Sequence, residues 1–410
     1  MSQTVLLVGA FDTKGPEYAF VRAQILANGL EVLTLNTGVL GTTDLFPVDV
    51  EADQVAQAGG STLNHLQEKK DRGEAMRVMA DGVAKLVPAL FTEGRFAGVM
   101  GLGGSGGSSV VTAGMRALPI GVPKVCVSTV ASGQTSAFVG AKDVVLFPSI
   151  TDVAGVNRIS QVIFTRAAGA VCGMVRATLP EAIDERPIIV ASMFGNTTEC
   201  VDDCREALDA QGYEVLVFHA TGTGGQTMEA LVDEGLVDAV LDITTTEWAD
   251  EICGGTLSAG PDRLSAPGRQ GVPHLIVPGC VDMANFGPVE TMPEKYKSGR
   301  NLYEWNPAIT LMRTTVEENA AMGKIFAEKA NAATGPVAFL LPLRGVSILD
   351  GEGERFCDRE ADAALFNALK ENLNPSIAVE EVDANINDKV FSARAVERML
   401  ELVAESAARK

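Results

Sequence analysis

Two stretches of the chain repeat the same order of apolar and polar positions. The segment that begins VLLVGAFDTKG and the segment that begins IIVASMFGNTT align without a gap, so that Gly29 falls on Gly212 at an offset of 183 residues. Each contains a short apolar run, a polar loop, an amphipathic stretch that ends at glycine, and a second apolar run. This order predicts a strand, a helix and a second parallel strand, the βαβ unit of a Rossmann-like sheet.

The remaining sequence continues this alternation in both halves. We therefore expect an α/β protein of two similar Rossmann-like domains, residues 1–182 and 183–410, each a mainly parallel sheet flanked by helices. A charged, proline-bracketed stretch at 179–187 predicts the linker. Residues 254–273, dense in Gly and Pro, predict a long ordered loop without a helix. The other predicted strands are 96–102, 123–130, 143–149, 237–244, 273–279, 336–343 and 376–384, and the other predicted helices are 76–91, 108–118, 153–176, 358–373 and 392–408.

Composition and charge narrow the class of protein. The 410 residues are 46% hydrophobic and 5% aromatic and include 42 glycines, which is typical of a soluble α/β protein. The formal net charge of −20 repels nucleic acid and anionic membrane surfaces, so neither is expected as a partner. The sequence starts without the features of a signal peptide, and its seven cysteines lack metal-binding spacing. Together these features predict a cytoplasmic protein with reduced thiols.

A glycine loop, GLGGSGGSSV at residues 101–110, joins a predicted strand to a predicted helix that starts near Ser108. Glycines let a backbone approach a phosphate closely, and a helix N-terminus offers unpaired N–H groups to it. A nicotinamide site needs an acidic residue about 20 positions on, but the first carboxylate after the loop is Asp143, and no Walker motif occurs. The loop therefore predicts a phosphate or nucleotide site of another type. The alternative is that the glycines only turn a tight corner.

Other polar residues follow predicted strands of the first domain and should meet the glycine loop at one edge of the sheet. Lys14 is suited to neutralise a phosphate, and Asp12 either caps a helix or holds Mg²⁺. Taken singly, each of the small polar residues also fits ordinary turn chemistry. The candidate cofactor-binding residues are Asp12, Thr13, Lys14, Gly103, Gly104, Ser105, Gly106, Gly107, Ser108, Ser128 and Thr129.

The second domain has a candidate ligand rim of its own. It comprises Asn196, Thr197, Thr221, Gly222, Thr223, Gly224 and Gly225. Four further residues, His219, Glu247, Asp282 and Arg344, are candidate catalytic groups that would face a common cleft with Asp250 and Glu251. Such a set is suited to hold Mg²⁺ and an acidic substrate, or to transfer protons. The alternative is that the carboxylates are exposed helix charges and the histidine a hydrogen-bonded residue at a strand end.

Several of these motifs carry a family resemblance. GAFDTKGPEYAFVR, GLGGSGGSSV, MFGNTTECV, FHATGTGGQTMEAL and PLRGVSILD resemble an uncharacterised family found in bacteria and fungi and as the N-terminal region of the tomato mosaic virus resistance protein. The resemblance implies two Rossmann-like domains, ATP binding and a homodimer. Its glycine-rich signature falls on residues 103–108, and its first-loop signature on Asp12, Thr13 and Lys14. In the plant protein a barrel domain follows this region, so the chemistry of that barrel would here need a separate partner protein.

These observations leave three functions open. The first is a nucleotide-binding protein that takes ATP, with or without Mg²⁺, and serves small-molecule metabolism through a ligand site at the interdomain cleft. The second is an enzyme that acts on a small organic acid, a sugar acid or keto acid, with carboxylates of the second domain. The third is a protein-binding module whose shape depends on nucleotide. The antiviral activity of the plant protein is not assigned to this chain.

Overall fold

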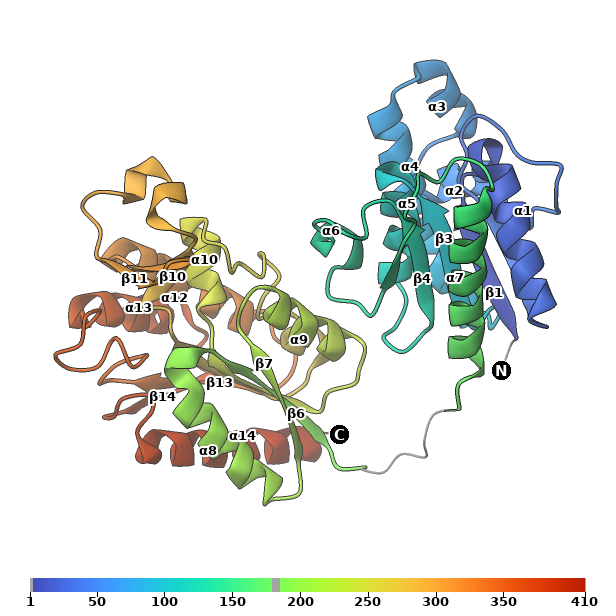
Figure 1. The fold of residues 1–410 in the computed structure, drawn as a ribbon. Coiled ribbons are helices and arrows are strands. Elements are labelled where there is room, and N and C mark those ends of the chain that lie inside the picture. Colours follow the sequence, from blue (N-terminus) through green and yellow to red (C-terminus); the bar gives the residue numbers. More distant parts are fainter. Residues whose placement is uncertain (1–2, 179–184, 410) are drawn as a thin grey trace. The chain divides into compact units, whose positions relative to one another are not determined.

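The computed structural model describes residues 3–178 and 185–409. The chain divides into two compact units, Met1–Glu181 and Ala182–Lys410, here called the N-terminal and C-terminal units (Figure 1). Each is an α/β unit with a parallel sheet flanked by helices, which confirms the predicted fold class. The predicted boundary and most of the predicted linker fall at 179–184, outside the described residues.

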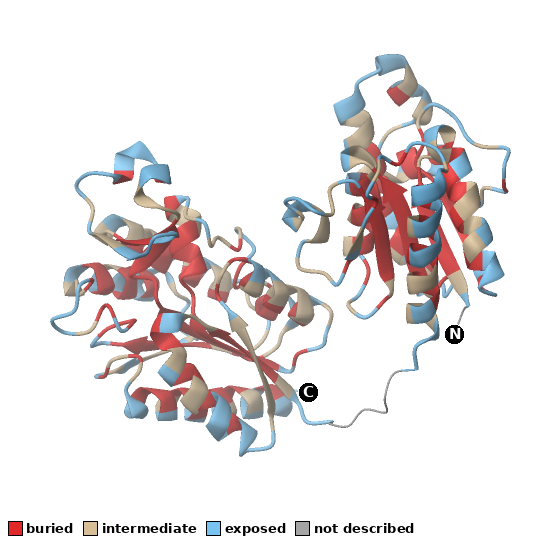
Figure 2. Ribbon diagram, in the orientation of Figure 1, coloured by how far each residue is buried: buried red, intermediate tan, exposed pale blue. Residues whose placement is uncertain are grey.

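The N-terminal unit is built around a five-stranded parallel sheet of order β2-β1-β3-β4-β5. Leu6 and Val8 pack with α2, α4 and α5, whereas Val5 and Leu7 pack with α1 and α7, because successive residues of a strand face opposite sides. Both faces of the sheet are thus apolar, and the central strands are buried (Figure 2). The strands are β1 (Thr4–Gly9), β2 (Glu31–Asn36), β3 (Gly98–Gly103), β4 (Lys124–Ser128) and β5 (Val145–Pro148), and the helices are α1 (Phe11–Ala27), α2 (Ala52–Ala58), α3 (Leu63–Lys69), α4 (Arg72–Thr92), α5 (Ser105–Arg116), α6 (Ser136–Val139) and α7 (Arg158–Arg176).

The C-terminal unit has a six-stranded parallel sheet of order β14-β13-β9-β8-β6-β7. Leu340 packs with α8 and α14 on one face, and Leu341 packs with α10, α12 and α13 on the other. The strands of this sheet are β6 (Ile188–Met193), β7 (Glu214–His219), β8 (Ala239–Thr244), β9 (His274–Gly279), β13 (Val337–Pro342) and β14 (Ala378–Val382). The helices are α8 (Thr198–Asp209), α9 (Thr223–Asp233), α10 (Glu247–Cys253), α11 (Ala266–Gln270), α12 (Val316–Asn331), α13 (Arg359–Asn372) and α14 (Lys389–Arg409).

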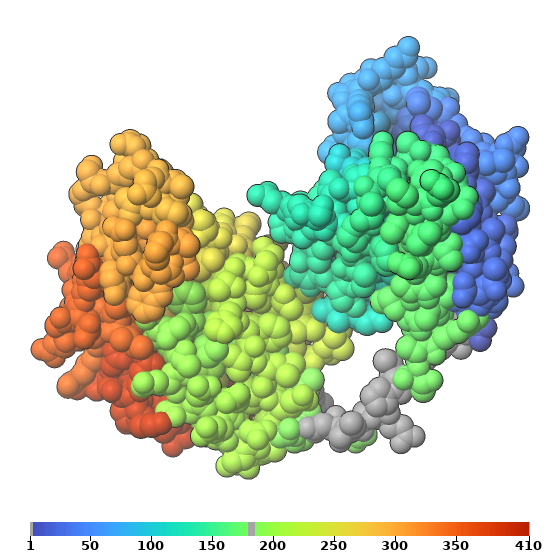
Figure 3. All heavy atoms as spheres, in the orientation of Figure 1, coloured from blue at the N-terminus to red at the C-terminus, as the bar shows by residue number. Residues whose placement is uncertain are grey.

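A second, antiparallel sheet of order β10-β12-β11 interrupts the alternation between β9 and α12. Its strands are β10 (Met283–Phe286), β11 (Leu302–Asn306) and β12 (Ile309–Arg313), with 3-10 turns at Val289–Thr291 and Glu294–Tyr296. These residues, orange in Figure 3, project from the rest of the C-terminal unit. The sequence pattern predicted no element here, since the short strands are joined by stretches without regular periodicity.

The structure also differs from the sequence prediction at the start of one helix and inside one predicted loop. Helix α5 begins at Ser105 rather than near Ser108, so half of the glycine loop is helical. The predicted loop at 254–273 contains the five-residue helix α11, which tolerates Pro267 because the first positions of a helix need no N–H donor. The predicted repeat is present, since β2 and β7 start at Glu31 and Glu214, 183 residues apart. In residues 3–178 and 185–409, no helix is long and apolar enough to cross a membrane.

Candidate functional site

A cavity of about 630 Å³ lies in the N-terminal unit where β1, β2 and β3 end. This volume is within the range of small-molecule sites, and the carboxyl edge of a parallel sheet is where such sites form. Its walls come from the turns after β1 and β2, the glycine loop and the α3–α4 connection. We call it the N-terminal pocket. The predicted cofactor-binding residues that line it are Asp12, Thr13, Lys14, Gly103, Gly104, Ser105, Gly106 and Gly107.

The glycine loop supplies a helix N-terminus to this pocket. Strand β3 ends at Gly103, Gly104 is the N-cap, and the first hydrogen bond of α5 runs from Ser108 N–H to Gly104 O at 2.9 Å. The N–H groups of Ser105, Gly106 and Gly107 precede that bond, so the helix itself offers them no partner. Together with the positive end of the helix dipole, these donors are suited to bind an anion.

The glycines of this loop have different structural roles. A Cβ on Gly101 would lie 2.8 Å from Val8 O, and one on Gly103 would lie 2.6 Å from Ser108 N, so both positions exclude a side chain. These two glycines let β3 pack against β1 and α5. A Cβ on Gly104 would meet nothing closer than Thr129 Oγ1 at 3.7 Å, and its φ of −74° suits any residue. Gly104 therefore leaves space in the pocket that the fold does not require.

Helix α1 begins at the same pocket. Asp12 does not cap α1, because its carboxylate accepts a hydrogen bond from Leu40 N–H at 2.9 Å and so fixes the turn after β2. Lys14 departs from helical geometry at φ −126° and ψ 22°, and its side chain lines the pocket. It forms no ion pair with another described residue. Thr13 is exposed at the first turn of the helix.

Tyr18 of α1 holds the ends of β1 and β3 beside the pocket. Pairing of the two strands stops at Val8 and Gly101. Beyond this point the buried Tyr18 hydroxyl accepts a hydrogen bond from Leu102 N–H at 2.8 Å and lies 2.7 Å from Val8 O and 3.0 Å from Leu102 O. Burial raises the pKa of this phenol, so it stays protonated and donates to one of these carbonyls. A Cβ on Gly9 would overlap the hydroxyl.

Three predicted cofactor-binding residues do not line the pocket. The hydroxyls of Ser108 and Ser128 are buried and 2.6 Å apart, and Ser108 also donates to Gly103 O at 3.2 Å. Thr129 N–H donates to the same carbonyl at 3.2 Å. These residues tie the end of β4 to the start of α5, so they shape the glycine loop from behind.

Sequence reasoning missed one wall of the pocket, which α3 and α4 supply. Gln67, Lys70, Arg72 and Met76 line it together with several apolar neighbours. These residues lie about 30 positions before the glycine loop in a segment for which the apolar pattern predicted no site. The basic run Lys-Lys-Asp-Arg at 69–72, directly before a long helix, was the available signal.

In the C-terminal unit, the carboxylate of Glu247 binds the N–H groups of the glycine rim that was predicted to bind a ligand. Its Oε1 accepts hydrogen bonds from Gly222 N–H at 2.8 Å and Gly225 N–H at 3.0 Å, at the N-terminus of α9. Its Oε2 accepts from Arg263 Nε at 2.6 Å. The side chain is 1% exposed, and a Cβ on Gly225 would overlap it. The predicted glycine rim thus binds a carboxylate of the same chain.

Arg263 links Glu247 to a buried charge network. Its guanidinium contacts Asp242 at 2.8 Å and Glu229 at 3.3 Å, and His274 Nε2 lies 3.0 Å from Asp242. Burial acts to raise the pKa of Asp242, but Arg263 and His274 outweigh it and hold this pKa well below its usual range. For Glu247, burial dominates and raises the pKa despite Arg263. A carboxylate with both oxygens bonded inside the protein is suited to hold the loop, not to exchange protons with a ligand.

The four candidate catalytic side chains do not converge within the C-terminal unit. His219 is the last residue of β7, and Arg344 follows β13. Three strands lie between β7 and β13 in the sheet. At about 4.8 Å per step, the two strand ends are about 19 Å apart. His219 and Arg344 are exposed, and Arg344 pairs with Asp383 at 2.7 Å, whereas Glu247 and Asp282 are buried. The prediction that all four face one cleft is not met in this unit.

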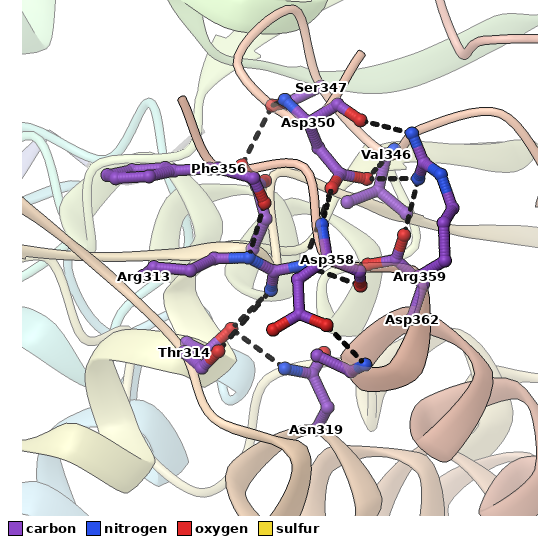
Figure 4. Close-up of polar contacts among 12 residues, drawn as sticks. Arg313, Thr314, Asn319, Val346, Ser347, Asp350, Phe356, Asp358, Arg359 and Asp362 are labelled. Carbon is purple, nitrogen blue, oxygen red and sulfur yellow. Dashed lines mark hydrogen bonds and ion pairs between the residues drawn. The ribbon is translucent and has the colours of Figure 1, made fainter. Parts of the chain in front are cut away.

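Arg313, Asp350, Arg359 and Asp362 form a charge cluster that is largely buried (Figure 4). Arg313 contacts Asp350 at 3.4 Å and Asp362 at 2.9 Å, and Arg359 contacts the same two carboxylates at 3.0 and 2.5 Å. The Asp282 carboxylate accepts a hydrogen bond from Ser347 Oγ at 2.9 Å, and its Oδ1 has no partner among the described residues. Burial raises the pKa of Asp282 to about 6, and burial together with Asp350 raises that of Asp362 to about 7.

Other predicted residues of the second rim are committed to the fold. Thr197 Oγ1 and Thr244 Oγ1 are buried and 2.7 Å apart, and Asn196 Nδ2 contacts the sulfur of Met283. Asp250 is buried, and its carboxylate accepts from Leu257 N–H, Asn285 N–H and Asn285 Nδ2. It is therefore not an exposed helix charge. Three residues of the rim are accessible to solvent. Thr221, before α9, and Gly224, in its first turn, are partly exposed, and Thr223, the first residue of α9, is exposed.

Comparisons with known proteins identify the family. Residues 3–180 match the N-terminal domain of the uncharacterised protein family UPF0261, and residues 186–403 match its C-terminal domain. A UPF0261 protein of Clostridium tetani is 46% identical over 404 residues, which cover 98% of this chain and 100% of that protein. The ToMV resistance protein Tm-1(GCR237) of Solanum lycopersicum is 38% identical over 99% of this chain and 56% of that protein.

Among solved structures, the Streptomyces sp. SF2575 glycosyltransferase SsfS6, complexed with thymidine diphosphate, is 14% identical over 99% of this chain and 96% of that chain. Its TM-score of 0.20 is too low to establish a shared fold. The family matches cover nearly the whole sequence, in both units. The chain belongs to the uncharacterised protein family UPF0261.

Proposed function

We propose that the N-terminal unit is an ATP-binding unit and that the N-terminal pocket is its nucleotide site. The observation that carries the proposal is that α1 and α5, which follow the neighbouring strands β1 and β3, both begin at one cavity of about 630 Å³. The free N–H groups of α5 and the positive dipole ends of both helices favour a phosphate chain over a neutral ligand. The apolar side of the same cavity, formed by Leu66, Met76, Met79 and Val110, suits a nucleobase.

The residues of the pocket fit the phosphates of ATP. Gly104 keeps its space open although the fold would accept a side chain there. Lys14 lines the pocket without an ion-pair partner among the described residues, so its ammonium group is available to a phosphate. Mg²⁺ usually binds to phosphate oxygens and to one or two carboxylates. When Mg²⁺ accompanies ATP, Asp12 and Asp152 of the N-terminal pocket are the carboxylates that we assign to it.

The proposal assigns one nucleotide to each chain. Strands β3 and β8 have equivalent places in the two sheets. In the N-terminal sheet β3 is third from the edge strand β2, and in the C-terminal sheet β8 is third from the edge strand β7. After β3 the chain continues with the glycine loop, whereas β8 ends at Thr244 and continues with Thr245-Thr246-Glu247, all buried. The amides at α9 already bind Glu247, so the C-terminal unit offers a phosphate no equivalent set of donors.

Isothermal titration of ATP with Mg²⁺ into the full chain tests the proposal. Gly104→Val fills the pocket without a clash within 3.7 Å of the new Cβ, so this variant should fold and lose binding. Gly173→Val is the matched control, because Gly173 is exposed on α7 and a Cβ there meets nothing within 4 Å. Saturable binding to the natural protein and to the control, and its loss in Gly104→Val, supports the proposal. No binding to the natural protein, or equal binding to all three, would refute it.

Other expectations from the sequence stay predictions. They comprise a homodimer, a cytoplasmic location, a ligand site between the units, a small organic acid as substrate and a separate barrel-domain partner. Light scattering of the purified protein checks the homodimer. Burial of Glu247 and Asp282 gives the enzyme hypothesis no accessible carboxylate at these two positions, so no substrate is proposed for them.

A further inference from the structure

Lys70 and Arg72 line the N-terminal pocket on the side opposite to the sheet. We infer that these two residues form a phosphate clamp, which makes the pocket selective for ligands with two or more consecutive phosphates. This inference rests on the proposed nucleotide site, and it states which phosphate ligands that site selects. The clamp residues come from the α3–α4 connection, a part of the chain that neither the glycine loop nor the first-loop motif includes.

The backbone of the α3–α4 connection directs the clamp toward the glycine loop. Helix α3 ends at Lys69, and its C-cap Lys70 has a left-handed φ of 53°. Asp71 then caps α4 by accepting a hydrogen bond from Glu74 N–H at 3.1 Å. Arg72 is the first residue of α4. Its Nη2 lies 3.7 Å from the point that a Cβ of Gly106 would occupy. An anion bound at the N-terminus of α5 would therefore lie within reach of the guanidinium.

Neighbouring basic residues differ from the clamp in their ion pairs. Lys69 pairs with Glu74 at 2.7 Å, and Arg77 pairs with Asp81 at 3.1 Å. Lys70 and Arg72, between them in sequence, are exposed and form no ion pair with another described residue. Their charged groups are therefore available to an anion that enters the pocket.

The number of donors argues for more than one phosphate. The three free N–H groups of Ser105, Gly106 and Gly107 are placed to hold one phosphate at the helix end. Lys14, Lys70 and Arg72 add three cations to the lining of the pocket, so a chain of phosphates that extends from the glycine loop would contact more of them than a single phosphate. Three carboxylates also line the pocket: Asp71 caps α4, Asp12 accepts a hydrogen bond from Leu40 N–H, and Asp152 is exposed. None of the three forms an ion pair with Lys14, Lys70 or Arg72.

Titration of phosphate ligands of different length tests the clamp. We would measure the binding of ATP, ADP, AMP and inorganic tripolyphosphate, with Mg²⁺, to the natural protein and to a Lys70→Gln and Arg72→Gln double variant. A double variant of the paired neighbours, Lys69→Gln and Arg77→Gln, is the control for the lost charge. Charge-assisted bonds to phosphate predict a loss of ATP affinity of about tenfold or more in the clamp variant. AMP affinity should change less than about threefold, and the control should match the natural protein.

The outcomes separate this inference from the proposed function. Equal affinity of the natural protein for ATP and AMP, or an unchanged ATP affinity in the clamp variant, would overturn the clamp while the nucleotide site stands. Tripolyphosphate binding that the clamp variant loses, without any binding of ATP, would support the clamp and refute the nucleotide site. Absence of binding for all four ligands would overturn both.

Discussion

The Tyr18→Phe substitution removes one oxygen atom from the N-terminal unit and should lower its stability strongly. The hydroxyl is buried and bonds the ends of two strands, so its loss leaves Leu102 N–H and one carbonyl, of Val8 or Leu102, without a partner. An unpaired buried polar group costs about 1–3 kcal/mol. Two such groups predict a loss of about 2–6 kcal/mol, a large share of the 5–15 kcal/mol that is typical of a whole domain.

The positions of the tryptophans allow this effect to be measured in one unit at a time. Trp248 and Trp305, the two tryptophans of the chain, both belong to the C-terminal unit. In urea unfolding, tryptophan fluorescence therefore follows the C-terminal unit, whereas far-UV circular dichroism follows both. Tyr18→Phe should move a circular dichroism transition to lower urea and leave the fluorescence transition in place. Tyr213→Phe is the control, because no described residue bonds the hydroxyl of this half-buried tyrosine.

Hydrogen exchange locates the effect more finely. The Leu102 amide should exchange faster in Tyr18→Phe, because the hydroxyl that accepts its hydrogen bond is lost. A change in unfolding free energy below about 0.5 kcal/mol, the usual range of neutral surface substitutions, would refute the reasoning. So would a shift of the fluorescence transition with no shift in circular dichroism.

Further predictions concern the C-terminal unit. Glu247→Gln replaces one carboxylate oxygen by an NH2 group, which leaves Arg263 Nε or the N–H groups of Gly222 and Gly225 without an acceptor, so we expect a loss of about 1–3 kcal/mol in urea unfolding followed by fluorescence; an unchanged midpoint would contradict the network. Burial raises the pKa of Asp282 from 3.8 to about 6 in the folded state, so the native state binds the proton more tightly and this stabilisation is lost as the pH rises through about 6. Asp282→Asn should make the unfolding midpoint less dependent on pH between about 4 and about 6, and an identical pH profile would contradict the assignment. Arg344→Ala removes an exposed ion pair and should change neither the melting temperature nor ATP binding; a loss of either would give Arg344 a role that its geometry does not indicate.

The sheets were predictable because their signal is local. Runs such as Val5–Val8 are apolar on both faces, since helices cover both sides of a parallel sheet, and the repeat at 183 residues marks the same unit twice. The antiparallel strands β10 to β12 gave no such signal. Their pairing joins Met283 to Arg313 across a 30-residue excursion whose pattern is irregular.

The candidate sites were predictable only in part, because their contacts are long-range. The glycine loop was found from its composition. The sequence does not show, however, that the packing requires a glycine at Gly103 and does not require one at Gly104. Glu247 was proposed as a catalytic group from its position after a strand. Only the fold shows that its carboxylate lies against Gly222 N–H, 25 residues earlier in the chain. Lys70 and Arg72 escaped notice for the same reason.

The carboxylate of Glu247 is an intramolecular ligand of the α9 N-terminus. A group held by the same chain acts at an effective concentration in the millimolar range or above, whatever the solution contains. A free anion that displaced Glu247 would also have to leave Arg263 without one of its partners. The loop at residues 222–225 is therefore set in one geometry at every ligand concentration. The α5 N-terminus has no tethered carboxylate among the described residues, so its occupancy would follow the supply of anions. The helix end of α5, unlike that of α9, is therefore suited to act as a sensor.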